Sequence, residues 1–173
     1  GCNTIPGTLE ITGEDVTNLD GLLGIQRIEG NLKLIAPNLE DISGLSELLE
    51  ITGRLNVGYP SGTKIRSLEP LSKLSALGNG VAIYDNDELL NVDGLSGVTV
   101  TSLDLWINGN EQLNDLSGFS NLVELNGDVV IINNPNLTSL EGLGSLEKIG
   151  GKLDLRDNKS LESIKALSGI QSI

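Results

Sequence analysis

The sequence contains a run in which apolar residues recur at every third position. The run consists of Leu137, Leu140, Leu143, Leu146 and Ile149. A spacing of three matches neither a strand, whose side chains alternate, nor an α-helix, whose period is about 3.6 residues. It is typical of a chain that coils around a long core and points one apolar side chain inward at each step. Just before the run, Val129 and Ile131 have the alternate spacing of a strand with one buried face.

These two spacings recur together along the chain. Aligning the repeats on Gly127 gives seven copies, which begin at Gly7, Gly30, Gly53, Asn79, Thr101, Gly127 and Gly151. In the fifth unit this alignment makes Leu103 and Leu105 the inward residues of the strand. Repeats of roughly 20–50 residues are typical of solenoids, whose stacked units bury each other's apolar faces. We therefore expect a β-rich solenoid of about seven coils with parallel sheets, forming a single domain over residues 1–173.

Small and polar residues mark the corners of the repeat. Glycine occupies one equivalent place in five units, at Gly21, Gly44, Gly94, Gly118 and Gly142. We expect these glycines to provide the positive φ of a sharp bend. Asparagine follows seven residues after the repeat start, at Asn86, Asn108, Asn134 and Asn158. An inward asparagine at this place is expected to hydrogen-bond the backbone of adjacent coils.

Composition disfavours several classes of function. The chain has 24 Asp and Glu against 11 Lys and Arg, a net charge of −13, which argues against nucleic acid and anionic membranes as partners. It contains no histidine, the commonest general base and metal ligand. It also lacks a phosphate-binding glycine loop, a Cys/His metal spacing and a nucleophile with a histidine partner. We therefore predict no enzymatic activity, no metal and no cofactor.

The single cysteine, Cys2, has three interpretations. It is an inert thiol, or it forms a disulfide with a cysteine outside this sequence, or it is the lipid-bearing first residue of a mature bacterial lipoprotein. The last two interpretations imply export. A lipid on Cys2 is the only membrane attachment that we expect.

The repeat Gly-x-Leu-x-Ile-x-x-Asn, followed by Leu-x-x-Leu-x-Gly-Leu-x-x-Leu-x-x-Ile, resembles the L domain of receptor ectodomains in the insulin receptor and epidermal growth factor receptor families. Residues 2–13 are more similar to bacterial cell-surface proteins with L-domain-like leucine-rich repeats. The resemblance implies a right-handed, β-helix-like leucine-rich-repeat fold, display outside the cell on a bacterial surface, and binding of another macromolecule. The presence of one cysteine departs from the receptor domains and favours the bacterial branch.

The outward positions of the strands are candidates for ligand binding. The candidate residues are Tyr84, Trp106, Ile132, Ala82, Val130 and Asp104. On the repeat alignment the first three share position five on consecutive coils, and the others share position three. An exposed patch of this kind is typical of a hot spot for protein binding, and its rings are also suited to stacking on sugars. Local packing and self-association are the alternatives for the same patch.

The leading hypothesis is a non-enzymatic cell-surface binding or adhesion module that recognises a protein or glycan through its sheet face. A passive structural spacer of a larger surface protein is the alternative, and it predicts that Trp106 is covered. A carbohydrate-active enzyme is a third hypothesis, which requires two carboxylates converging in a groove. The carboxylates considered for this role are Asp85, Asp87, Asp104, Asp128 and Asp154. No feature of the sequence indicates a raised carboxylate pKa.

Overall fold

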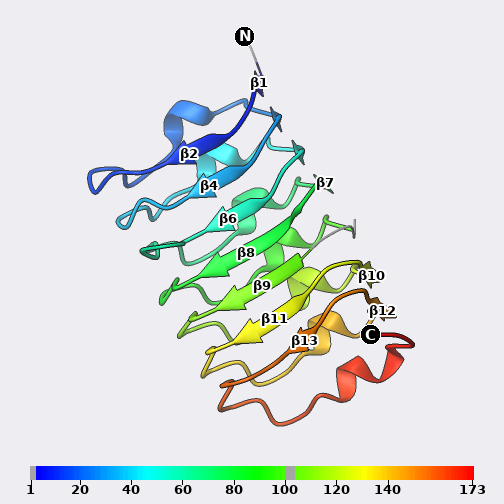
Figure 1. Cartoon of the computed structure of the whole chain (residues 1–173). Helices are drawn as coiled ribbons and strands as arrows, with labels where there is room; N and C mark the ends of the chain where they lie inside the picture. The colour runs from blue at the N-terminus through cyan, green and yellow to red at the C-terminus, as the bar shows by residue number, and fades with distance from the viewer. Residues whose placement is uncertain (1–2, 100–103) are drawn as a thin grey trace.

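The computed structural model describes residues 3–99 and 104–173, which form short parallel strands and 3₁₀ helices (Figure 1). Among these residues, seven strands make one large sheet in the order β13-β11-β9-β8-β6-β4-β2. Their bounds are β2 Leu9–Ile11, β4 Leu32–Leu34, β6 Leu55–Val57, β8 Gly80–Tyr84, β9 Asp104–Asn108, β11 Val129–Ile132 and β13 Leu153–Asp154. All of their pairings are parallel, so the strands follow one another in chain order.

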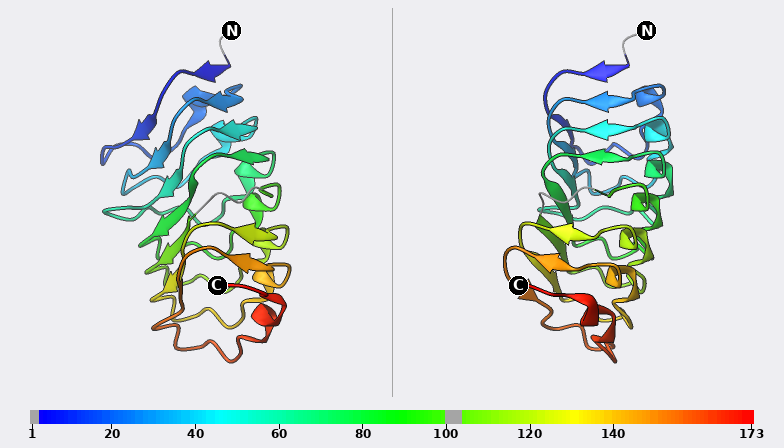
Figure 2. Two further views of the ribbon diagram at one scale, coloured as in Figure 1. Left: turned by 45° about the vertical axis from the view of Figure 1, so that its right-hand side comes forward. Right: turned by 90° about the vertical axis from the view of Figure 1, so that its right-hand side faces the viewer.

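Within residues 3–99 and 104–173, two smaller parallel sheets accompany the large one. The first contains β1 Thr4–Ile5, β3 Arg27–Ile28, β5 Glu50–Ile51 and β7 Ala76–Leu77, and the second contains β10 Glu124–Leu125 and β12 Lys148–Ile149. Figure 2 shows these short strands crossing one side of the molecule, between the large sheet and a column of 3₁₀ helices. The protein is therefore β-rich, with parallel sheets and short helices.

The column of 3₁₀ helices explains the apolar spacing of three. Its members are η1 Asp20–Leu22, η2 Ser43–Leu45, η3 Glu69–Leu71, η4 Asp93–Leu95, η5 Ser117–Phe119, η6 Glu141–Leu143 and η7 Lys165–Gly169. A 3₁₀ helix has about three residues per turn, so side chains at i and i+3 lie on the same face. Leu143 lies in η6, and hydrogen bonds of the same i→i+3 type join it to Leu140 and Leu146 on either side, so all three point into the core and have no exposed surface.

Each of these 3₁₀ helices is preceded by a short polar side chain that caps its first turn. The residue two positions before the helix accepts a hydrogen bond from the first helical N–H, at 2.6–3.3 Å. The capping residues are Asn18, Asp41, Ser67, Asn91, Asp115, Ser139 and Ser163. Asn, Asp and Ser favour such local turns because their side chains reach the backbone two residues ahead.

The corner glycines allow close packing, and the prediction that they provide positive φ is wrong. None of the five has a positive φ. A Cβ at Gly44 would overlap the carbonyl oxygen of Leu19, and a Cβ at Gly118 would overlap that of Val92. At Gly21, in the first repeat, nothing lies within 4 Å of such a Cβ. At the other four positions glycine is therefore required, because consecutive 3₁₀ helices approach each other through their backbones.

The core is a continuous cluster of apolar side chains, nearly all aliphatic, between the sheets and the helix column. Pairing brings residues one repeat apart side by side, as in Leu9 with Leu32 and Leu32 with Leu55. Val129 and Ile131 point inward as predicted and are fully buried. Burying each such side chain contributes about 1.5–3 kcal/mol, so neighbouring repeats supply much of each other's stability.

The register of the fifth repeat differs from the prediction by two residues. Leu105 is paired with Val81 and Val129. The inward residues of β9 are therefore Leu105 and Ile107, both buried, instead of Leu103 and Leu105. Leu103 itself lies outside the described residues. A shift of two keeps every side chain on the same face of a strand, so the hydrophobic pattern does not distinguish the two registers.

A column of buried asparagines follows the large sheet and joins its last repeats. It consists of Asn86, Asn110, Asn134 and Asn158, so that Asn110 takes the place predicted for Asn108. The Oδ1 atoms of the last three each accept a hydrogen bond from the backbone N–H of the preceding asparagine, at 3.0–3.1 Å. The Nδ2 of Asn110 also donates to the carbonyl oxygen of Ile83 at 3.2 Å. The predicted backbone-bonding role of the inward asparagine is confirmed.

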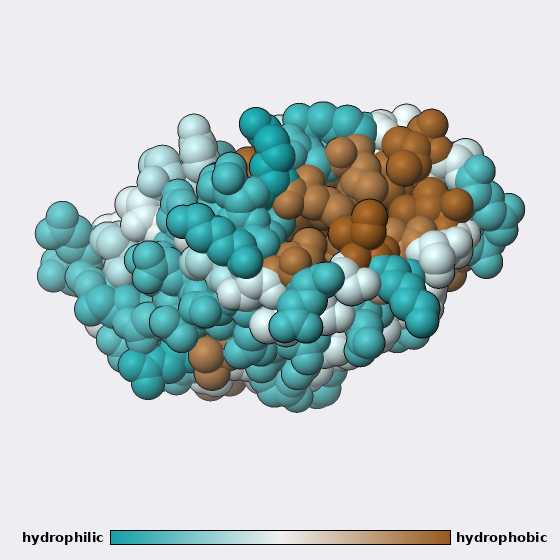
Figure 3. Space-filling model, turned by 90° about the horizontal axis from the view of Figure 1, so that it is seen from below, coloured by the Kyte–Doolittle hydropathy of each residue, from teal (hydrophilic) through white to brown (hydrophobic). Residues whose placement is uncertain are grey.

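The C-terminal end of the molecule presents an apolar surface (Figure 3). It contains a hollow of about 580 Å³, whose apolar lining residues are Leu153, Ile164, Leu167, Ile170 and Ile173. Ile164 and Ile173 are 61% and 69% exposed. The surface is apolar because β13 is the last described strand of the sheet, so the core residues there have a neighbouring repeat on one side only.

Candidate functional site

Trp106 lies in the middle of the outer face of the large sheet. It is paired with Ala82 in β8 and with Val130 in β11. The repeat alignment had instead placed it beside Tyr84 and Ile132, at position five. Trp106 belongs to position three, and this correction follows from the two-residue shift of β9.

The same shift changes the surroundings of the other candidates. Asp104 lies at position one, where it is paired with Gly80, and the prediction of position three is wrong. Asn108 lies between Tyr84 and Ile132. Ile132 is therefore diagonal to Trp106 across the strands and borders the patch.

Ala82 and Val130 are buried even though they point to the outer face. Each is only 2% exposed. Trp106, on the strand between them, is half-buried. The structure thus brings these three predicted residues together, but the surface that they offer to a ligand comes from the indole ring alone.

Three aromatic side chains follow one another across the face, and we call them the aromatic row: Tyr59, Tyr84 and Trp106. The ring centroids of Tyr59 and Tyr84 are 5.3 Å apart, and those of Tyr84 and Trp106 are 6.5 Å apart. The rings are tilted by 59° and 41°, within the range of favourable aromatic contacts. Lys152 places its Nζ 5.6 Å from the centroid of the Trp106 ring, in a cation–π contact.

Tyr59 was not among the candidates from the sequence. It lies in the insertion that follows β6 and is 56% exposed, which makes it the most open ring of the row. The sequence does contain a signal for the contact between Tyr59 and Tyr84, because Tyr59 follows one strand closely and Tyr84 ends the next strand of the same sheet.

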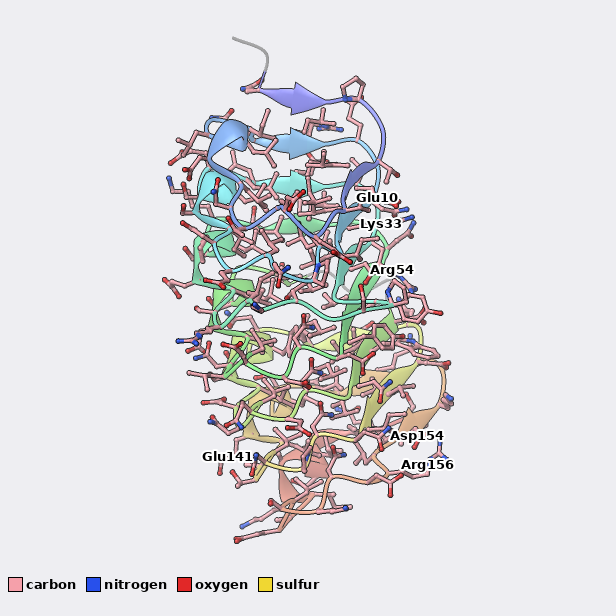
Figure 4. All side chains as sticks on the ribbon, turned by 90° about the vertical axis from the view of Figure 1, so that its left-hand side faces the viewer. Glu10, Lys33, Arg54, Glu141, Asp154 and Arg156 are labelled. Carbon is pink, nitrogen blue, oxygen red and sulfur yellow. The ribbon has the colours of Figure 1, made fainter. Side chains whose placement is uncertain are left out.

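A polar hollow of about 330 Å³ adjoins the aromatic row. It is lined by Asn31, Lys33, Arg54, Asn56, Asn79 and Asp104, and we call these residues the polar hollow. Figure 4 shows Glu10, Lys33 and Arg54 following one another along this side of the molecule. The Nζ of Lys33 contacts a carboxylate oxygen of Glu10 at 2.9 Å, so its charge is balanced.

An ion pair crosses the sheet within the hollow. The Nη2 of Arg54 lies 2.7 Å from the Oδ2 of Asp104. The strand between them contributes Gly80, which has no side chain, and a Cβ there would lie 3.6 Å from the Nε of Arg54 and against the backbone of Asp104. Because half-exposed ion pairs contribute only about 0–1 kcal/mol, this pair shapes the hollow more than it stabilises the fold.

Two buried polar atoms on this face lack a hydrogen-bond partner in the described structure: Asn56 Oδ1 and Trp106 Nε1. Ala82 separates these residues, since it is paired with Asn56 on one side and Trp106 on the other. An unsatisfied buried polar atom costs about 1–3 kcal/mol and is uncommon in native proteins. Two of them, on the strands on either side of Ala82, mark this part of the sheet as a candidate for ligand contact.

Burial raises the pKa of the Tyr84 hydroxyl above its ordinary value. The positive charge of Arg54 opposes this effect, whereas the charge of Asp104 adds to it. The aromatic row and the Arg54–Asp104 pair are therefore close enough to interact electrostatically.

Three of the carboxylates considered for catalysis take part in hydrogen bonds along the sheet. Asp104 Oδ1 accepts from the backbone N–H of Asp128 at 3.0 Å, and Asp128 Oδ1 accepts from that of Lys152 at 2.9 Å. Asp154 accepts two hydrogen bonds of 2.8 Å from the Arg156 guanidinium, beside which it lies in Figure 4. These bonds hold the pKa of Asp154 below its ordinary value.

Asp85 has a raised pKa, which no feature of the sequence indicated. Its pKa lies above the ordinary value, mainly because of partial burial and then because of the nearby charge of Asp87. Asp85 remains exposed by surface area, so solvent screens much of this effect. Asp87 also lines a second hollow of about 350 Å³ at the corner after the strands, together with Glu111 and Asp157.

Comparison with models of known protein families and with curated proteins finds no match to this chain. Cys2 lies outside the described residues. No helix within residues 3–99 and 104–173 is both long and apolar enough to cross a membrane. The same residues contain no group of three or more Cys, Asp or Glu side chains arranged to hold a metal ion.

Proposed function

We propose that this chain is a non-enzymatic binding module that recognises a protein or glycan through the outer face of its large sheet. The observation that carries the proposal is the position of the aromatic row next to the polar hollow, on a face built by parallel strands in continuous register. Half-buried aromatic rings surrounded by polar groups are typical of binding hot spots.

We further propose that the fold is a right-handed L-domain-like leucine-rich-repeat solenoid of about seven coils, displayed on a bacterial cell surface. The sequential strand order, the column of 3₁₀ helices and the asparagine column support the repeat architecture. The surface location rests on the sequence resemblance. Antibody labelling of intact cells tests it: labelling only after cell lysis would contradict surface display.

A binding role is favoured over catalysis because the polar hollow contains one carboxylate, Asp104, and that carboxylate is paired with Arg54. Glycoside hydrolysis usually needs two carboxylates on either side of the scissile bond. The corner hollow provides the direct test of the enzyme hypothesis. Release of sugars by the purified protein that disappears in Glu111→Gln would overturn the non-enzymatic proposal.

Trp106→Ala tests the binding proposal. Purified protein is applied to arrays of matrix proteins and glycans, and the affinity for each bound component is then measured for the variant. Removing a hot-spot aromatic costs about 2 kcal/mol or more, which corresponds to roughly a 30-fold weaker Kd. Val123→Ala is the matched control, because Val123 is 44% exposed but lies outside this face.

The spacer hypothesis predicts a different result from the same experiment. It expects Trp106 to contribute packing only, so that Trp106→Ala lowers the unfolding midpoint and leaves every measured affinity unchanged. That outcome would refute the binding proposal, provided that circular dichroism shows both variants to be folded.

A further inference from the structure

We infer that the ligand of this face is a neutral oligosaccharide, with a sugar ring stacked on the aromatic row and its hydroxyl groups in the polar hollow. The inference rests on the proposed function, because it names the ligand class of the same face. Its support comes from the charge balance of the hollow, the chemistry of its side chains and the dimensions of the site.

The charges around the hollow favour an uncharged ligand. Its two cations are each matched by a carboxylate, Arg54 by Asp104 and Lys33 by Glu10. A third cation of the site, Lys152 over the Trp106 ring, lies 4.0 Å from a carboxylate oxygen of Asp154. An anionic ligand would have to displace these carboxylates, and a cationic ligand would have to displace the cations. A hydroxyl group needs neither, since it donates to the carboxylate and accepts from the guanidinium.

The remaining lining residues are suited to hydroxyl groups for the same reason. Three of them are asparagines, Asn31, Asn56 and Asn79, and each amide both donates and accepts hydrogen bonds. Asn56 Oδ1 and Trp106 Nε1 are an acceptor and a donor without partners, on either side of Ala82. Both atoms are buried in the ligand-free chain, so a sugar on this face satisfies them only if the side chains of Asn56 and Trp106 rotate outward when it binds.

The dimensions of the site accommodate a short sugar chain. A volume of about 330 Å³ is at the low end for ligand pockets, so it holds a small part of a ligand and leaves the rest on the open face. The site extends from Lys33 in β4 to Trp106 in β9, three strand spacings of about 4.8 Å each, or about 14 Å. This length exceeds one sugar ring and accommodates an oligosaccharide.

Trp106 is the only tryptophan of the chain, so its fluorescence reports on the site directly. The full chain is titrated with the neutral tetrasaccharides cellotetraose, maltotetraose, mannotetraose and chitotetraose, and binding is followed by Trp106 fluorescence and by calorimetry. We expect a saturable change with at least one of them. Tyr84→Ala and Asn56→Ala should each weaken that binding at least 10-fold, while Val123→Ala should change it less than twofold.

The outcomes separate this inference from the proposed function. A lack of saturable binding to all four tetrasaccharides overturns the oligosaccharide inference. A second measurement uses fibronectin and mucin before and after enzymatic deglycosylation. Binding that depends on Trp106 and survives deglycosylation assigns the ligand to the protein class, which refutes the inference and leaves the proposed function standing. Binding to the tetrasaccharides that is unchanged in Trp106→Ala, Tyr84→Ala and Asn56→Ala refutes both.

Discussion

Asn110→Ala is the substitution that tests the repeat register most directly. Asn110 is fully buried and connects three repeats. Its Oδ1 accepts from the backbone N–H of Asn86 at 3.1 Å, and its Nδ2 donates to the carbonyl oxygen of Ile83 at 3.2 Å. Alanine leaves both of these backbone groups without that partner. At about 1–3 kcal/mol for each, the expected loss in the free energy of unfolding is about 2–6 kcal/mol.

Asn108→Ala is the matched control, because the same amide is removed two residues away. Asn108 is half-buried, and its Oδ1 accepts one side-chain hydrogen bond, from Asn133 Nδ2 at 2.9 Å. Since this bond lies at the surface, its loss should cost about 0.5–1.5 kcal/mol.

The assay is urea unfolding of both variants, followed by circular dichroism and by Trp106 fluorescence. The free energies are comparable only if the two signals change together, because repeat proteins can unfold in parts. If the signals separate, the midpoints of the individual transitions are compared. A larger loss for Asn108→Ala than for Asn110→Ala would refute the register of β9, and with it the position of Trp106 between Ala82 and Val130.

Three further predictions concern the helix column and the ionisable groups. Gly118→Ala should destabilise the protein by about 1–3 kcal/mol or more in the same urea assay, because the added Cβ overlaps the backbone of the preceding repeat. Gly21→Ala should be neutral or stabilising by up to about 1 kcal/mol, because nothing lies near its added Cβ. Equal effects of the two substitutions would contradict the close packing of the helices. The backbone hydrogen bond from Ser43 lowers the pKa of Asp41 in the folded protein. The ionised Asp41 carboxylate therefore stabilises the fold above the ordinary carboxyl pKa, and this stabilisation is lost as pH falls through the folded-state pKa. An NMR titration that gives Asp41 an ordinary carboxyl pKa would contradict this. Because burial raises the pKa of Tyr84, the neutral hydroxyl contributes stability that is fully present below the ordinary tyrosine pKa and is lost as pH rises through the folded-state pKa. Tyr84→Phe should remove this alkaline dependence of the unfolding midpoint.

Much of the fold could be predicted from the sequence because the repeat is encoded locally. The alternate and third-residue spacings identify the inward side chains without reference to partners, as Val129, Ile131 and Leu140 show. The side chains that cap the 3₁₀ helices were not recognised, although Asn, Asp or Ser recurs at the same place in each repeat. That signal is also local, and sequence analysis had access to it.

The candidate site was predicted only in part. Tyr84 and Trp106, both predicted, lie in one aromatic row, although they are diagonal to each other instead of side by side at position five. Tyr59, Asn56 and Arg54 were missed. Tyr59 enters the row from an insertion whose path is not periodic. Asn56 and Arg54 gain their role from side chains across the sheet, and the repeat pattern carries no information about such contacts.

The sequence by itself determined which face of each strand is buried, because side-chain alternation makes an error of one residue expose the entire core. It did not determine the register of β9. The inward pair is either Leu103 and Leu105 or Leu105 and Ile107, since all three are apolar and alternate, and an asparagine follows at the expected distance in both cases, at 108 or at 110. Only the tertiary structure decided between these registers, through the pairing of Leu105 with Val81 and Val129 and through the column of buried asparagines. That decision placed Trp106 between Ala82 and Val130 and Asp104 opposite Arg54, where we propose that the ligand binds.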